Sequence, residues 1–286
     1  MYAMLKKFFA VTLVLMLAFS LSGCGSNEPT EVEPQGSDGK YEDGIYFAQE
    51  DEFVKDWKYL VTIEVKDGEI VSADWNGANI NAGPDKDTVS KSGGYPMVEN
   101  GGAQAPWHEQ AEKAEAYLVE TQDPTQIAYN DDAGHTDDIA GVSIHVIEFF
   151  ELAEKALANG PVGRGPYKDG AYFAEEDDFV KDFKYSASLT VINGNIVAAD
   201  WDGLHTDGSD KDTMSIEGEY PMVENGGAQA PWHEQAEKAA AYLLEIQDPT
   251  AVVYSDDAGH TDDIAGVSIH VIEFFELAEK ALEEAK

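Results

Sequence analysis

The sequence predicts an α+β fold, carried by two copies of one domain in tandem. A long internal repeat shows the duplication, because the segment that begins at Tyr95 (YPMVENGGAQAPWHEQAEKA) recurs unchanged from Tyr220. Within each copy a β-hairpin pattern comes first and helical patterns follow, an order typical of α+β domains. A repeat of this length indicates whole domains rather than the short units of a solenoid.

The hairpin is expected where two alternating segments flank a tight turn. In the first copy residues 59–65 alternate in polarity, Lys66-Asp67-Gly68 forms the turn, and residues 70–75 return. Residues 186–201 repeat the pattern around Asn193-Gly194. Asp-Gly and Asn-Gly pairs favour the turn that joins two antiparallel strands.

Two helices are expected after the hairpin. Apolar residues at helical spacing follow Pro106, which suits a first helical turn, and they stop at Asp123-Pro124. A last helix is expected to begin near Ser143. Its buried face would consist of Ile147, Phe150, Ala153 and Leu157.

The N-terminal residues indicate secretion. Residues 1–23 combine a basic start with an apolar stretch that is shorter than the roughly 20 residues a bilayer needs, as in a signal peptide. The only cysteine, Cys24, follows Leu21-Ser22-Gly23, which resembles a lipobox, so Cys24 is expected to be lipidated; the alternative is an ordinary signal peptide. The expected organisation is then a flexible linker over 24–40, domain 1 over 41–157, a linker over 158–166 and domain 2 over 167–286.

Composition excludes several classes of function. The chain has 56 acidic and 18 basic side chains, a balance that repels nucleic acid. Such a surface attracts cationic partners, or it simply keeps a surface protein soluble. With Cys24 as the only cysteine, no disulfide framework, thiolate zinc site or cysteine nucleophile remains in the mature protein.

Three motifs in each copy resemble the bacterial FMN-binding domain. They are Asp-Gly-x-Tyr near the start, the hairpin turned by Lys-Asp-Gly, and a closing Asp-x-x-small-Gly-small-Ser/Thr segment. This domain occurs in subunits of the sodium-translocating NADH:quinone reductase and of the Rnf complex. With the lipobox and the tandem copies, the whole chain resembles the flavin-carrying lipoproteins of Gram-positive extracellular electron transfer.

The resemblance implies that a flavin transferase attaches FMN through a phosphoester to the last residue of the closing motif. The matching residues are Asp137, Gly141 and Ser143 in domain 1, and Asp262, Gly266 and Ser268 in domain 2. This chain has Ala-Gly-Val-Ser where the common family form has Ser-Gly-Ala-Thr. Noncovalent FMN, or no FMN, therefore stays open. From the residues alone, each serine could instead be an ordinary helix N-cap.

A second set of candidate flavin-binding residues follows the Gly-Gly turn of each copy. Trp107 and Trp232 could stack on the flavin ring, and His108 and His233 could donate a hydrogen bond to it. The equally weighted alternative places both tryptophans in the core and both histidines on a solvated helix face. Trp75 and Trp201, in the hairpin strands, are expected in the core.

The Asp- and Gly-rich segments around His135 and His260 match neither a calcium loop nor a zinc spacing, and we expect turns rather than metal sites. Scattered carboxylate pairs would suit a hydrolase, but so many acidic residues produce such pairs by chance.

The expected function is electron transfer by two covalent FMN groups on the outer face of the cell membrane, to which a lipid anchor holds the protein. Electrons would come from a membrane quinol or NADH dehydrogenase and pass to ferric or soluble flavin acceptors. The alternative is a cofactor-free surface lipoprotein that binds a cationic ligand or a cell-wall component.

Overall fold

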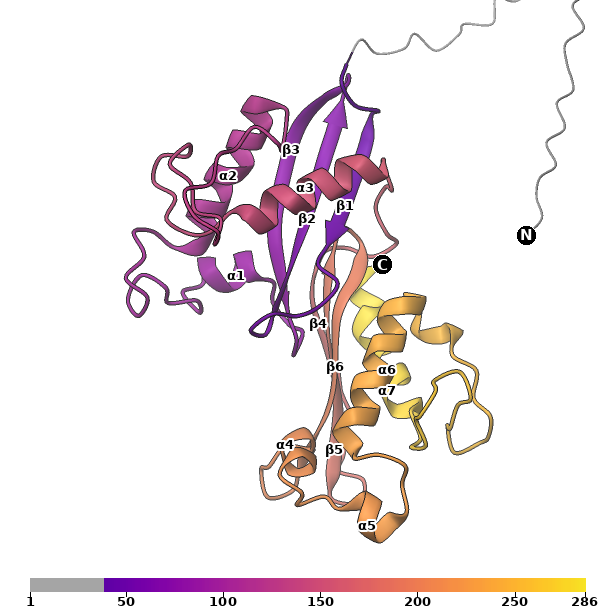
Figure 1. Cartoon of the computed structure of the whole chain (residues 1–286). Coiled ribbons are helices and arrows are strands. Elements are labelled where there is room, and N and C mark those ends of the chain that lie inside the picture. Colours follow the sequence, from indigo (N-terminus) through magenta and orange to yellow (C-terminus); the bar gives the residue numbers. More distant parts are fainter. Residues whose placement is uncertain (1–38) are drawn as a thin grey trace, which may run out of the picture. The chain divides into compact units, whose positions relative to one another are not determined.

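A computed structural model describes residues 39–286 (Figure 1). The expected signal peptide, Cys24 and most of the first linker lie outside the described residues. Within the described range, no helix has both the length and the apolar character needed to cross a bilayer.

A three-stranded antiparallel sheet forms the centre of domain 1. Its strands β1 (Gly44–Gln49), β2 (Trp57–Lys66) and β3 (Glu69–Asn79) are neighbours in chain order. The hairpin between β2 and β3 is confirmed, with Lys66 paired to Glu69 across a two-residue turn. Asp67 and Gly68 both have positive φ, as this turn type requires. Strand β1 was not among the expected elements.

Three helices follow the sheet: α1 (Lys86–Lys91), α2 (Trp107–Thr121) and α3 (Ile147–Asn159). Helix α2 contacts β3, and α3 contacts β1 and β2, so both helices cover the sheet (Figure 1). Their apolar faces close a core with one face of the sheet. Its largest members include Tyr46, Trp75, Trp107, Phe149 and Phe150.

The expected start of the last helix was wrong. Helix α3 begins at Ile147, after Val146 as N-cap, and no side chain caps it. Ser143 lies outside the helix, so the N-cap role does not apply to it. The physical reason is that residues 143–146 bond elsewhere: the amides of Ser143 and Ile144 donate to Gln110, and the amide of Val146 donates to Gly134.

Domain 2 repeats the architecture. Its sheet consists of β4 (Gly170–Glu175), β5 (Phe183–Ile192) and β6 (Asn195–His205) in that order, again antiparallel. The helices are α4 (Lys211–Ile216), α5 (Met222–Gly226), α6 (Trp232–Ile246) and α7 (Ile272–Leu282), with short 3-10 turns at Pro249–Ala251 and Glu283–Ala285. Helix α7 begins at Ile272, so Ser268 also lies before the helix rather than at its start. The prediction of an α+β fold with two similar domains is confirmed.

Candidate functional site

The loop that carries Ser143 is held by one buried side chain. Gln110 of α2 is fully buried, and its Oε1 accepts the backbone N–H of Ser143 at 2.7 Å and of Ile144 at 3.2 Å. The Ser143 hydroxyl lies 3.2 Å from the same oxygen. The amide nitrogen of Gln110 in turn donates to the carbonyl of Ala105 at 2.7 Å. Ser143 itself is exposed, so its hydroxyl is accessible on a loop whose backbone is fixed.

Domain 2 builds the same arrangement. Gln235 is fully buried, and its Oε1 accepts the N–H of Ser268 at 2.6 Å and lies 3.2 Å from its hydroxyl. Its amide nitrogen donates to the carbonyl of Ala230 at 2.7 Å. Ser268 is exposed like Ser143. The two candidate attachment sites therefore have one geometry.

A lysine from α2 reaches the same loop. Lys113 Nζ donates to the carbonyl of Gly141 at 2.9 Å. Gly141 has a φ of +77°, and a Cβ there would lie 2.8 Å from Lys113 Nζ, so a larger residue would be strained and would push the ammonium away. In domain 2 a Cβ at Gly266 would lie 3.0 Å from Lys238 Nζ. The closing motif contains no basic residue, but the fold supplies one.

The aspartates of the motif differ in role. Asp137 and Asp262 are exposed. The next residue, Asp138, is structural, because its Oδ2 accepts the N–H of Ala128 at 2.8 Å; Asp263 does the same for Val253 at 2.9 Å. The motif therefore contributes one free carboxylate and one loop-closing carboxylate in each domain.

The two tryptophans of the second candidate set belong to the core. Trp107 and Trp232 are each only 2% exposed. The ring of Trp107 packs against Trp75 at 5.3 Å and Tyr59 at 6.2 Å between centroids. A flavin ring cannot stack on a face that is already covered, so the core interpretation fits the structure. Trp75 and Trp201 are buried as expected.

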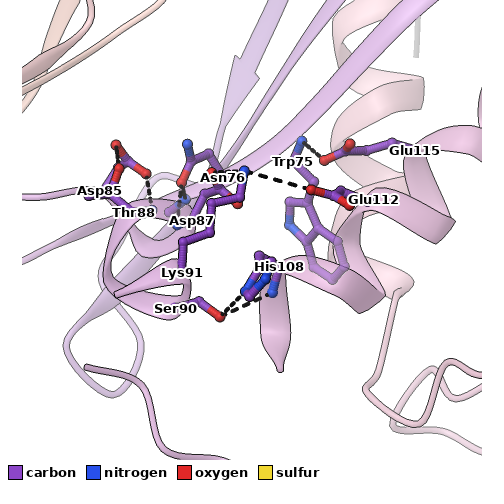
Figure 2. Close-up of polar contacts among 11 residues, drawn as sticks. Trp75, Asn76, Asp85, Asp87, Thr88, Ser90, Lys91, His108, Glu112 and Glu115 are labelled. Atoms are coloured by element: carbon purple, nitrogen blue, oxygen red, sulfur yellow. Dashed lines mark hydrogen bonds and ion pairs between the residues drawn. The ribbon is translucent and has the colours of Figure 1, made fainter. Parts of the chain in front are cut away.

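The histidines that follow these tryptophans join two helices. Figure 2 shows His108 and Ser90 facing each other between α2 and α1. The Ser90 hydroxyl lies 2.8 Å from His108 Nδ1 and accepts the His108 backbone N–H at 3.2 Å. His233 and Ser215 repeat the pair at 2.9 and 3.2 Å. Both histidines are half-buried and tie the short helix to the long one.

A carboxylate on α2 accepts a backbone hydrogen bond from the edge strand β3 of the sheet in domain 1. Glu115 accepts the backbone N–H of Trp75 at 2.8 Å, and the neighbouring Glu112 contacts Lys91 (Figure 2). Burial raises the pKa of Glu115 to about 8, against the lowering effect of the Trp75 bond. Domain 2 has Ala240 at the equivalent position, so this group is specific to domain 1.

Sequence reasoning missed a buried lysine in each domain. Lys86 is 1% exposed, and its Nζ lies 4.2–5.6 Å from the ring centres of Trp57, Tyr59, Tyr95 and Trp107. Lys211 is 2% exposed and has four rings at 4.1–5.2 Å, among them Tyr185, whose hydroxyl accepts from Nζ at 2.6 Å. Burial lowers the pKa of both lysines to about 8. The recurrence of aromatic residues was visible, but a lysine is normally expected in solvent.

The segments around His135 and His260 form turns, as the composition indicates. Asp131 accepts the N–H of His135 at 3.1 Å and contacts its Nδ1 at 2.8 Å. Within residues 39–286, no group of three or more His, Cys, Asp or Glu side chains could hold a metal ion.

The chain is similar to two solved structures. A Clostridium thermocellum protein with a solution NMR structure is 62% identical; the match covers 41% of this chain and 91% of that protein, with a TM-score of 0.34. A Clostridium perfringens protein with a crystal structure is 25% identical over 42% of this chain and 88% of its own, also with a TM-score of 0.34. No protein-family model and no curated protein matches the chain.

Proposed function

We propose that the protein is an electron carrier on the outer face of the cell membrane, with one FMN attached covalently to Ser143 and one to Ser268. The observation that carries this proposal is an exposed serine hydroxyl on a loop whose backbone is fixed by a buried glutamine, in both domains. A modification site needs both properties, because the hydroxyl must be accessible and must be presented in one position.

The residues around Ser143 fit a flavin phosphate. Lys113 supplies a positive charge next to the loop, and Gly141, which has no side chain, allows the ammonium to approach the backbone closely. The backbone N–H of Ser143 bonds to Gln110 independently of the hydroxyl. Esterification of Oγ therefore sacrifices only the longer 3.2 Å contact and leaves the loop anchored.

Attachment requires an activated flavin phosphate and the proposed flavin transferase. The Ser143 oxygen forms a new bond to the phosphorus of a flavin nucleotide whose phosphate is part of an anhydride. The anhydride P–O bond breaks, and the departing nucleoside monophosphate takes the bonding electron pair. The serine proton passes to solvent. The product is a phosphodiester, so no electron is gained or lost by the protein.

When bound, FMN would supply the redox chemistry, and the protein would supply position and electrostatics. The excess of acidic side chains repels anions and attracts cations at the surface. The proposed donors are a membrane quinol or NADH dehydrogenase, and the proposed acceptors are ferric complexes or soluble flavins. Cys24 would provide the lipid anchor that keeps both domains next to the donor.

The test is intact mass together with in-gel flavin fluorescence of the denatured mature protein, co-expressed with a flavin transferase. We expect two FMN additions in the wild type, one in Ser143→Ala, one in Ser268→Ala and none in the double variant. Ser72→Ala, which removes an exposed hydroxyl from β3, serves as control and should keep both additions.

Absence of added mass in the wild type would overturn covalent attachment. The chain would then fit the alternative, a cofactor-free lipoprotein that binds cationic ligands through its acidic surface. Additions that persist in the double serine variant would instead place the flavin on other residues.

A further inference from the structure

Two imidazoles lie side by side in each domain, although the sequence gives them no metal-binding spacing. The rings of His135 and His145 have centroids 6.3 Å apart and planes at 80°. His260 and His270 repeat this at 6.3 Å and 72°. All four side chains are 39–43% exposed, so solvent reaches each ring.

A carboxylate orients each ring. His135 Nδ1 lies 2.8 Å from Asp131 Oδ2, and His145 Nδ1 lies 2.7 Å from Glu148 Oε2. Since a carboxylate only accepts, each Nδ1 carries a proton. In the neutral imidazole the lone pair is then on Nε2, which is the ring atom free to bind a metal. A histidine that binds a metal usually has this arrangement, with its other ring nitrogen donating to a carboxylate. The pairs His260–Asp256 and His270–Glu273 have the same distances.

The backbone that carries the two rings is fixed. The N–H of Val146 donates to the carbonyl of Gly134 at 2.9 Å, which joins the His135 turn to the segment containing His145. Gly134 has a φ of +85°, and a Cβ there would collide with Ile147, so the two segments are in close contact. In domain 2 Val271 donates to Gly259 at 2.8 Å. Main-chain contacts therefore hold the two segments together, and the carboxylates orient the rings.

We propose that each histidine pair, His135 with His145 and His260 with His270, is a site for one divalent transition-metal ion such as Zn²⁺, Ni²⁺ or Cu²⁺. Imidazole suits these ions. A zinc–nitrogen bond is about 2.1 Å long, so two rings on one tetrahedral ion have centres about 5.3 Å apart. The observed centres are 6.3 Å apart, so the two rings would close by about 1 Å when they bind an ion. Water completes the coordination, because the described residues offer no third protein ligand.

The site is independent of the proposed flavin. His145 lies two residues after Ser143, so a bound ion would add positive charge beside the candidate attachment loop. Metal binding can nevertheless be measured on protein that has never been exposed to a flavin transferase, and its failure would leave the attachment test unaffected.

The experiment is calorimetric titration of the mature protein with Zn²⁺, in a buffer whose excess Mg²⁺ saturates exposed carboxylates. NMR of ¹⁵N-labelled histidine reports which ring nitrogens bind. We expect two Zn²⁺ per chain in the wild type, with shifts at the Nε2 atoms of the four paired histidines. His145→Gln and His135→Gln should each leave one Zn²⁺, and His145→Gln combined with His270→Gln should leave none.

Two further variants sharpen the result. His205→Gln removes a histidine that also contacts a carboxylate, Asp207, but lies in neither pair, so it should keep two Zn²⁺. Asp131→Asn keeps the backbone acceptor but removes the charge that orients His135, and it should weaken domain 1 binding roughly 10- to 100-fold. Zinc binding that survives in the double histidine variant, or no saturable binding in the wild type, would overturn the proposal.

Discussion

The buried carboxamide of Gln110 accepts the backbone N–H of Ser143 across 33 positions of sequence, at 2.7 Å. Its other end donates to Ala105, so one side chain fixes both the entry to α2 and the loop before α3. Because Gln110 is fully buried, its carboxamide has no water as an alternative partner. The position of the Ser143 hydroxyl therefore depends on a residue outside its own motif.

Replacing Gln110 should destabilise domain 1 and disturb the candidate site. In Gln110→Met the backbone N–H groups of Ser143 and Ile144 lose their acceptor, which should cost about 1–3 kcal/mol of unfolding free energy. Chemical denaturation measures the loss, and amide hydrogen exchange at Ser143 should accelerate. Ser268, held by Gln235, provides an internal control whose exchange should stay unchanged. Unchanged exchange at Ser143 would show that Gln110 does not hold the loop.

Lys113 should assist attachment at domain 1 only. The ammonium beside Gly141 stabilises the negative charge that a flavin phosphate brings to the loop. Lys113→Met should slow flavin incorporation at Ser143 roughly 3- to 10-fold, in keeping with a partly exposed charge pair of about 1 kcal/mol. The rate is followed by peptide mass analysis of both sites in one sample. An equal slowing at Ser268 would point to transferase recognition rather than to a local charge.

The sequence predicts the fold class well, because its evidence is local. Asp67-Gly68 specifies a turn through backbone conformations that only a few residues adopt readily, and the alternation of residues 59–65 specifies a strand. The start of α3 depends instead on competition for hydrogen bonds. The amide of Ser143 bonds to a glutamine on another helix, and no local pattern around Ser143 reveals that partner.

The residues of the candidate site also differ in whether a local sequence pattern or only tertiary packing reveals them. The candidate serines are indicated by a short motif, whereas Gln110 and Lys113 reach the site only through tertiary packing. The burial of Lys86 is the clearest case, since its charge argues for solvent and only the assembled aromatic rings argue for the core. A charged residue is therefore predicted correctly as exposed only where the fold does not surround it with groups that stabilise its charge.

Glu115 should make the stability of domain 1 fall as the pH rises. Burial raises its pKa from 4.5 to about 8, so the folded state binds its proton more tightly than the unfolded state. The contribution is complete below pH 4.5 and is lost as the pH rises through 8. Because Glu115 is partly exposed, we expect about 1–2 kcal/mol after solvent screening.

The matched variant is Glu115→Gln, whose oxygen can still accept the N–H of Trp75. Thermal denaturation from pH 5 to pH 9 should show a steeper decline for the wild type than for this variant. Glu69→Gln, a change at an exposed glutamate of β3, should behave like the wild type. Parallel profiles for the wild type and Glu115→Gln would contradict the burial of this charge.

Lys86 should have the opposite effect, and at higher pH. Its pKa falls from 10.5 to about 8 on folding because the ammonium loses water, so the unfolded state holds the proton more tightly. The contribution to stability is complete above pH 10.5 and is lost as the pH falls through 8. This change corresponds to at most about 3 kcal/mol, and the attraction of the ammonium to the four rings reduces it.

In Lys86→Met the rise in stability from pH 8 to pH 10 should be smaller than in the wild type, measured by urea denaturation. Lys66→Met, at an exposed end of β2, should keep the wild-type slope; an equal slope in Lys86→Met would mean that the ring cage compensates fully for the lost hydration.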